Sequence, residues 1–153
     1  MRLHNKITAI ICSLAILLSV GASPVSAVSG NITPYGSAYI NATSWSVGGS
    51  IGTTFVVSYA INATSVFADV GATKVQIFRS SDGANWTLMK TYNYTLVEEM
   101  MGHNKMNHTY TIKYDGVANY YYRAKVFFWV GDGTNGDERT YYTTTVGLPV
   151  SKS

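Results

Sequence analysis

A cluster of carboxylate and imidazole side chains is the first place in this sequence where metal chemistry could occur. Glu98, Glu99, His103 and His108 lie close together in the chain. A protein zinc site needs three or four ligands within tetrahedral reach, often framed as H-E-x-x-H on a helix. The two histidines here are five residues apart and have no such frame. We therefore interpret the segment as a solvated loop and expect neither a metal site nor a cofactor.

The glycine-rich segment DGTNGDE (132–138) offers the oxygen ligands that calcium prefers. A calcium loop presents these oxygens at alternating positions, as in D-x-[DN]-x-[DN]-G. Counted from Asp132, the third and fifth positions are a threonine and a glycine, so the register does not fit. We interpret 131–138 as a hairpin loop. Asp82-Gly83 is a second predicted hairpin turn, because this dipeptide tolerates left-handed backbone angles.

The sequence contains no motif that indicates covalent or acid–base catalysis. Serines are abundant, but no G-x-S-x-G nucleophile elbow occurs. The adjacent carboxylates Glu98 and Glu99 would point to opposite faces of a strand. We therefore assign no catalytic residues and expect a protein that is not an enzyme.

The segment NYYYRAKVFFWV (119–130) is the strongest candidate for binding, since it holds six aromatic residues, two cations and no acid. Alternate side chains of a strand point to opposite faces. One face is predicted to lie in the core, with Tyr120, Tyr122, Ala124, Val126, Phe128 and Val130. The other face is the candidate binding surface, with Tyr121, Arg123, Lys125, Phe127 and Trp129.

Aromatic rings flanked by cations could stack on sugar rings or anchor a protein partner. We expect Tyr121 and Arg123 to be exposed. For Phe127 and Trp129 the alternative is that segment 95–107 or the N-terminal leader covers them. The expected partner is an extracellular glycan or protein, and the sequence does not choose between them.

The N-terminus has the pattern of a cleaved secretory signal. Arg2 and Lys6 precede an apolar run, Ile7 to Val20, and small residues at Val25 and Ala27 predict cleavage after Ala27. The apolar run is short for a membrane span, which needs about 20 residues. We expect a secreted protein without a membrane span after cleavage, although retention of the segment as an anchor is the alternative.

Removal of residues 1–27 leaves residues 28–153, which suit one domain with a substantial core. The formal net charge falls from +3 to +1, because the segment contains two cations and no acid. This balance predicts no nucleic-acid partner. The only cysteine, Cys12, is removed with the signal, so the core must stabilise the secreted domain without disulfides.

The remaining sequence is rich in tyrosine, threonine, glycine and asparagine, which is typical of an all-β protein. We divide it into a flexible leader (28–36), a β domain (37–148) and a C-terminal tail (149–153). The predicted strands are 37–47, 51–61, 73–80, 86–94, 108–115, 119–130 and 139–148. Segment 62–72 is predicted as a connection, and 95–107 as a loop or one helical turn. About seven short strands separated by turns indicate a β-sandwich.

The alternation within these strands also predicts core residues outside 119–130. They are Phe55, Val57, Val75, Ile77 and Ile112.

The segment YYYRAKV (120–126) resembles the strand near the end of fibronectin type III and related immunoglobulin-like domains. VQIFRSSDGANWTLMKTY (75–92) likewise resembles the central hairpin of that family. The resemblance covers about 70–148 and implies an immunoglobulin-like antiparallel sandwich, with Tyr120 as the tyrosine whose hydroxyl bonds back to nearby backbone. The tryptophan usual in the family's second strand is absent. The whole secreted chain also resembles small secreted proteins of gut Firmicutes, which implies a host-associated bacterium and no particular activity.

These observations favour a secreted binding module that performs no catalysis. The alternative is a structural protein that assembles into homo-oligomers through the poorly protected edge strands 39–47 and 140–146. A secreted effector acting on neighbouring cells is a third possibility that the sequence does not test.

Overall fold

The structure of the protein is a computed structural model. It describes residues 28–32, 38–49 and 53–148, with side chains for the last two ranges. The predicted signal peptide 1–27, its cleavage after Ala27 and the tail 149–153 lie outside the described residues. No helix within the described part is long and apolar enough to cross a membrane.

The described chain is all-β, as the sequence predicts, and every strand pairing in it is antiparallel. The elements in chain order are β1 (Val28–Ile32), β2 (Ile40–Gly49), β3 (Thr54–Ser80), β4 (Thr87–Asn93), the single 3-10 turn η1 (Glu98–Met100), β5 (Met101–Asp115), β6 (Tyr121–Asp132), β7 (Asn135–Tyr142) and β8 (Val146–Gly147).

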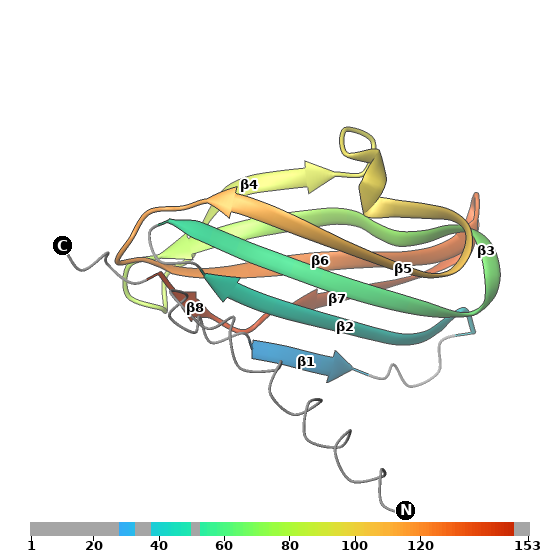
Figure 1. Ribbon diagram of the computed structural model, residues 1–153, viewed down its shortest axis with the longest axis horizontal. Coiled ribbons are helices and arrows are strands. Elements are labelled where there is room, and N and C mark those ends of the chain that lie inside the picture. The colour runs from blue at the N-terminus through green and yellow to red at the C-terminus, as the bar shows by residue number, and fades with distance from the viewer. Residues whose placement is uncertain (1–27, 33–37, 50–52, 149–153) are drawn as a thin grey trace, which may run out of the picture.

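Strand β3 is long and bent, and it belongs to two layers of the structure (Figure 1). Its first half pairs with β2 on one side and with β5 on the other. Its second half pairs with β4 and β6, and β7 continues this layer beyond β6. The register shifts between Asn62 and Phe67, and such a β-bulge bends a strand and increases its twist. The hydrogen bonds of both layers therefore depend on one strand.

The prediction of a connection over 62–72 is wrong, because β3 continues through it. The turn-favouring residues Asn62, Thr64 and Ser65 lie at the bulge, where the strand bends without reversing direction. From Phe67 onward the backbone resumes pairing with β5, and soon afterwards with β6. These pairings involve residues far away in sequence, which a local pattern does not reveal.

Four other predicted segments differ from the structure. Residues 28–32 of the expected flexible leader form β1, which pairs with β2. Segment 95–107 contains the helical turn η1, but its second half begins β5. The loop expected over 131–138 is reduced to the two residues between β6 and β7, where Gly133 has a φ of 68°. The last strand expected over 139–148 is divided into β7 and β8.

The core lies between the two layers, and aromatic rings meet across it. Phe55 and Tyr122 stack with ring centroids 5.6 Å apart, and Tyr59 meets Phe128 edge-on at the same distance. The Tyr59 hydroxyl donates to the Met100 carbonyl at 2.8 Å, and burial raises the pKa of Tyr59. Seven of the eight residues expected as structural are buried, namely Tyr122, Val126, Phe55, Val57, Val75, Ile77 and Ile112.

Tyr120, the eighth of these residues, is partly buried and packs against the core. The hydroxyl that bonds back to nearby backbone belongs instead to Tyr122, which accepts the N–H of Val117 at 2.7 Å. A Cβ at Gly116 would lie 2.9 Å from Cζ of Tyr122, so the glycine makes room for this ring. The assignment of this role to Tyr120 is therefore wrong. The hydroxyl belongs to the tyrosine two residues later, on the same face of the strand.

Strand β2 differs from the poorly protected edge strand that the sequence predicts over 39–47. Its side chains alternate between buried and partly exposed positions, and the Trp45 ring is only 7% exposed. Trp45 lies opposite Tyr59 in the register with β3. β1 pairs along the other side of β2, so β2 is not an edge strand over residues 43–47. Trp45 thus fills the core from β2. The family resemblance places a tryptophan instead on the predicted strand 51–61, which forms the first half of β3.

Replacement of Tyr122 by phenylalanine tests the role of its hydroxyl. We expect Tyr122→Phe to lower the free energy of unfolding by about 1–3 kcal/mol, because the Val117 N–H loses its acceptor while the buried ring remains. Equilibrium urea denaturation measures this change. The control is Tyr120→Phe, whose cost we expect to stay below about 0.5 kcal/mol. An equal or larger cost for Tyr120→Phe would contradict the assignment.

Candidate functional site

The five predicted binding residues lie on the outer face of β6, away from the core. Tyr121 is 43% exposed, and the others, Arg123, Lys125, Phe127 and Trp129, are partly exposed and alternate with buried residues. Segment 95–107 does not cover this face as a whole. β1 belongs to the other layer, and Tyr94, Thr95 and Met101 form one side of a groove beside Trp129.

Arg123 lies between two aromatic rings that the sequence analysis did not connect with it. Its guanidinium carbon is 4.2 Å from the ring centroid of Trp86 and 4.7 Å from that of Tyr142. Its Nε atom is buried and has no hydrogen-bond partner among the described residues. The expectation that Arg123 is simply exposed is therefore wrong, because Trp86 from before β4 and Tyr142 from β7 enclose it.

Two lysines continue this pattern along the face. Nζ of Lys125 lies 5.0 Å from the ring centroid of Phe127 and 5.2 Å from that of Tyr142. Nζ of Lys74, on β3, lies 4.9 Å from the Phe127 centroid. Together these cations and rings form a surface that we call the aromatic–cation strip, which consists of Trp86, Arg123, Tyr142, Lys125, Phe127 and Lys74.

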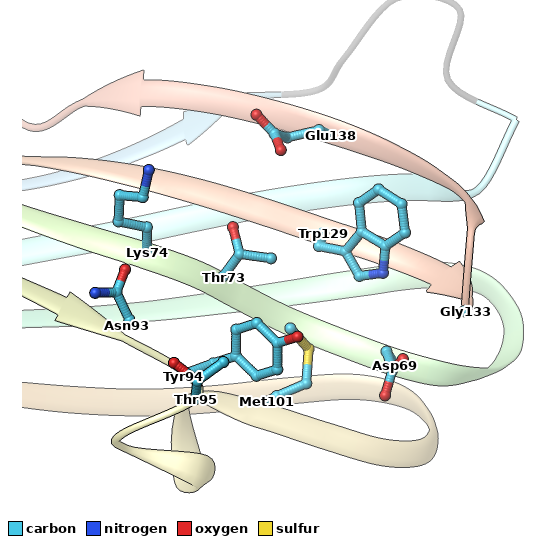
Figure 2. Close-up of a pocket in the computed structure, with 10 residues that line it drawn as sticks. All are labelled: Asp69, Thr73, Lys74, Asn93, Tyr94, Thr95, Met101, Trp129, Gly133 and Glu138. Carbon is cyan, nitrogen blue, oxygen red and sulfur yellow. The ribbon is translucent and has the colours of Figure 1, made fainter.

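A groove of about 440 Å³ opens beside the strip and contains Trp129 (Figure 2). We call it the Trp129 groove. Tyr94 follows β4 and Trp129 lies on β6, so the two rings stand on either side of β3. The groove combines aromatic, apolar and hydrogen-bonding groups, and its lining residues are Asp69, Thr73, Lys74, Asn93, Tyr94, Thr95, Met101, Trp129, Gly133 and Glu138.

The indole of Trp129 rests against two glycines of the β6–β7 hairpin. A Cβ at Gly136 would lie 2.5 Å from Cζ2 of Trp129, and a Cβ at Gly131 would lie 2.8 Å from the same atom. Real Cβ atoms do not approach other atoms so closely, so only glycine permits this position of the ring. The hairpin therefore fixes the indole before any ligand arrives, which lowers the entropy cost of binding.

The acidic groups near the groove are held by specific partners. Asp69 contacts Nδ1 of His103 at 2.8 Å. The two aspartates of the β6–β7 hairpin accept backbone N–H groups, Asp132 from Ala68 at 2.7 Å and Asp137 from Tyr39 at 3.0 Å. These carboxylates attach the hairpin to the bend of β3 and to the start of β2.

The four residues weighed as a zinc site do not converge. His103 contacts Asp69, whereas Nε2 of His108 lies 2.9 Å from the carbonyl oxygen of Glu99. Burial lowers the pKa of His108. Within the described residues, no group of three or more histidine, cysteine or acidic side chains could hold a metal ion.

The hairpin turn at Asp82-Gly83 satisfies its own polar groups. The Asp82 carboxylate accepts the backbone N–H groups of Asn85 at 2.8 Å and Ala84 at 2.9 Å, and the Ser80 hydroxyl at 2.7 Å. These hydrogen bonds, that of Asn85 first, hold the pKa of Asp82 well below its usual value. Gly83 has a φ of 75°, as the predicted turn requires. We regard this turn as structural.

A scan of the chain against protein-family models finds no match, and a search of the curated proteins finds none either.

The packing of Trp129 against the hairpin glycines can be tested by adding a methyl group at Gly136. We expect Gly136→Ala to lower the free energy of unfolding by about 1–3 kcal/mol, because the new Cβ meets the indole and a backbone oxygen of β6. Chemical denaturation gives the cost, and near-ultraviolet circular dichroism reports displacement of the indole. Gly147→Ala is the control, since its Cβ would meet only the Tyr121 ring at an ordinary 3.6 Å. Equal effects of the two variants would argue against this packing of the indole on the glycines.

The stacked position of Arg123 predicts that charge alone does not replace it. Arg123→Lys keeps the charge but loses the planar group between the two rings. We expect a loss of about 0.5–2 kcal/mol in the free energy of unfolding, measured by urea denaturation. Lys113→Met on the exposed face of β5 should change stability by less than about 0.5 kcal/mol. A neutral outcome for Arg123→Lys would mean that the stack contributes little.

Proposed function

We propose that this chain is a secreted immunoglobulin-like β-sandwich domain that binds extracellular carbohydrate through the Trp129 groove and the adjoining strip. The observation that carries the proposal is the fixed indole of Trp129, which stands beside hydrogen-bonding side chains in an open groove. The proposed activity is binding without catalysis.

The immunoglobulin-like part of the proposal is supported by topology and by one hydrogen bond. Strands β2, the first half of β3 and β5 pair in one layer, and β4, the second half of β3, β6 and β7 pair in the other. Two packed antiparallel layers are the architecture of that class. The bond between the Tyr122 hydroxyl and the Val117 N–H resembles the tyrosine corner of these domains.

A carbohydrate is favoured over a protein partner by the mixture of groups in the groove. One face of a sugar ring carries C–H groups that pack on aromatic rings, and its hydroxyls need donors and acceptors nearby. Trp129 and Tyr94 supply the rings, while Asn93, Thr73 and Glu138 supply polar atoms around them (Figure 2). Protein-binding hot spots rely more on deep, desolvated apolar pockets. This groove is open and mixes polar with apolar groups.

Secretion is proposed from the N-terminal pattern alone, with cleavage after Ala27. The intact mass of the protein recovered from the medium of an expressing bacterium tests it directly. A mass equal to that of residues 28–153 supports secretion with cleavage. Retention of the full chain in the membrane fraction would instead indicate an anchor.

The binding proposal is tested by screening the purified protein on an array of neutral and acidic glycans. We expect at least one glycan to bind, and Trp129→Ala and Tyr94→Ala each to weaken that binding at least about tenfold, as central aromatic contacts do. Met106→Ala on β5, an exposed apolar residue outside the groove, is the matched control. Thermal melts establish that each variant folds. Unchanged affinity in a folded Trp129→Ala variant would refute the proposed site.

Self-assembly is the second candidate function, because β7 ends the strand path and has no partner on its outer side within the described residues. Three consecutive charged residues, Asp137 to Arg139, lie on β7 and discourage the addition of another strand. Light scattering over a range of concentrations tests this alternative. Growth of oligomers with concentration would favour it over glycan binding.

A further inference from the structure

We propose that the ligand is an acidic polysaccharide, whose carboxylate or sulfate groups contact the lysines of the aromatic–cation strip while a sugar ring stacks on Trp129. This inference rests on the proposed function, since it names the class of glycan that the same surface takes. It is carried by the distribution of charge on the outer face of the second layer.

The cations of the strip are not neutralised by the protein's own acids. Lys74, Lys125 and Arg123 form no salt bridge with any carboxylate of the described residues, where the single close pair is His103 with Asp69. Aromatic rings are their neighbours instead, at 4.2 to 5.2 Å from the closest centroids. No lysine or arginine of the described residues forms a salt bridge, so this face is distinguished by three cations that lie together against aromatic rings.

A ring neighbour leaves a lysine able to bind an anion. A cation–π contact at an exposed site is weak, and it occupies one side of the ammonium group. The remaining N–H donors of Lys74 and Lys125 stay available for a carboxylate or sulfate, with which hydrogen bonds are stronger because both partners are charged. Both lysines share the Phe127 ring as a neighbour.

The strip is long enough for a chain and not only for a single ion. Its residues on β6 alternate from Arg123 to Phe127, and Trp129 of the groove follows on the same face. Arg123 and Trp129 are about 20 Å apart at the usual rise of a strand. The strip leads directly into the Trp129 groove, because Lys74 belongs to both surfaces. An extended polymer could therefore contact the lysines and the groove at the same time.

The acidic side chains of the groove determine which part of the polymer lies there. Glu138 and Asp69 line the groove, whereas the charged residues of the strip are all cations. An anionic substituent would be repelled near the two acids and attracted near Lys125. We therefore infer that an uncharged part of the polymer stacks on Trp129 and that its acidic groups extend toward Arg123.

The test measures binding of the whole purified protein to matched polymers by isothermal titration calorimetry. The probes are polygalacturonate and dextran sulfate as carboxylated and sulfated chains, unmodified dextran as the neutral chain, and polyglutamate and oligo-dT as polyanions without a polysaccharide backbone. We expect one acidic polysaccharide to bind at least tenfold more tightly than dextran, polyglutamate and oligo-dT. Its affinity should fall as salt is raised, because salt screens exposed charges.

Variants locate the charges that matter. Lys125→Gln and Lys74→Gln should each weaken binding of the acidic polysaccharide about fivefold, which corresponds to about 1 kcal/mol per charge contact. Lys113→Gln, on the exposed face of β5 in the other layer, is the matched control and should bind as the natural protein does. Melting temperatures establish that all three variants fold.

The possible failures are distinguishable. If a neutral glycan binds through Trp129 and the lysine variants bind normally, the proposed function stands and the acidic ligand is refuted. Equal weakening by Lys113→Gln would reveal non-specific attraction and also overturn the inference. Tighter binding of oligo-dT or polyglutamate would reassign the strip to another class of polyanion. If no glycan of either kind binds, both proposals fail.

Discussion

The bend of β3 is the constraint on which the rest of the structure depends. One strand supplies the hydrogen-bond partners for β2 and β5 in the first layer and for β4 and β6 in the second. Its two halves must therefore face each other at the separation that the core side chains fill. The bulge after Asn62 and the hydrogen bond from Ala68 to Asp132 fix where the strand changes layers. Every side chain of the candidate site is positioned from that point.

The candidate site follows from this arrangement of the second layer. β3 lies between β4 and β6, so it carries Lys74 and Thr73 between Tyr94 on one side and Trp129 on the other. The outer faces of β3, β6 and β7 then align Lys74, Phe127 and Thr140 in one cross-strand row. Glycines of the β6–β7 hairpin provide the flat surface on which the indole rests. The site is thus built on paired strands, which hold side chains more rigidly than loops do.

The sequence was most informative where a strand is buried on one face. The alternation of 119–130 predicted correctly which side chains of β6 enter the core, because a strand has a period of two whatever it pairs with. It could not show that Trp86 and Tyr142 enclose Arg123, since these three residues meet only through pairings between distant strands. The Trp129 groove was missed for the same reason, although Trp129 itself was recognised. The error between Tyr120 and Tyr122 arose because two tyrosines of the same face both match the local pattern.

The order of the strands along the chain also determines when each part of the structure can form. The consecutive strand pairs β2–β3, β3–β4 and β6–β7 form locally, whereas the bond between Tyr39 and Asp137 joins residues 98 positions apart. Contacts between distant residues form slowly, because a long loop must close before they are gained. During synthesis, β2 and the first half of β3 appear well before β5 and β6. These two strands are therefore exposed until the later strands cover them. The core of such a chain can close only after most of its strands have been synthesised.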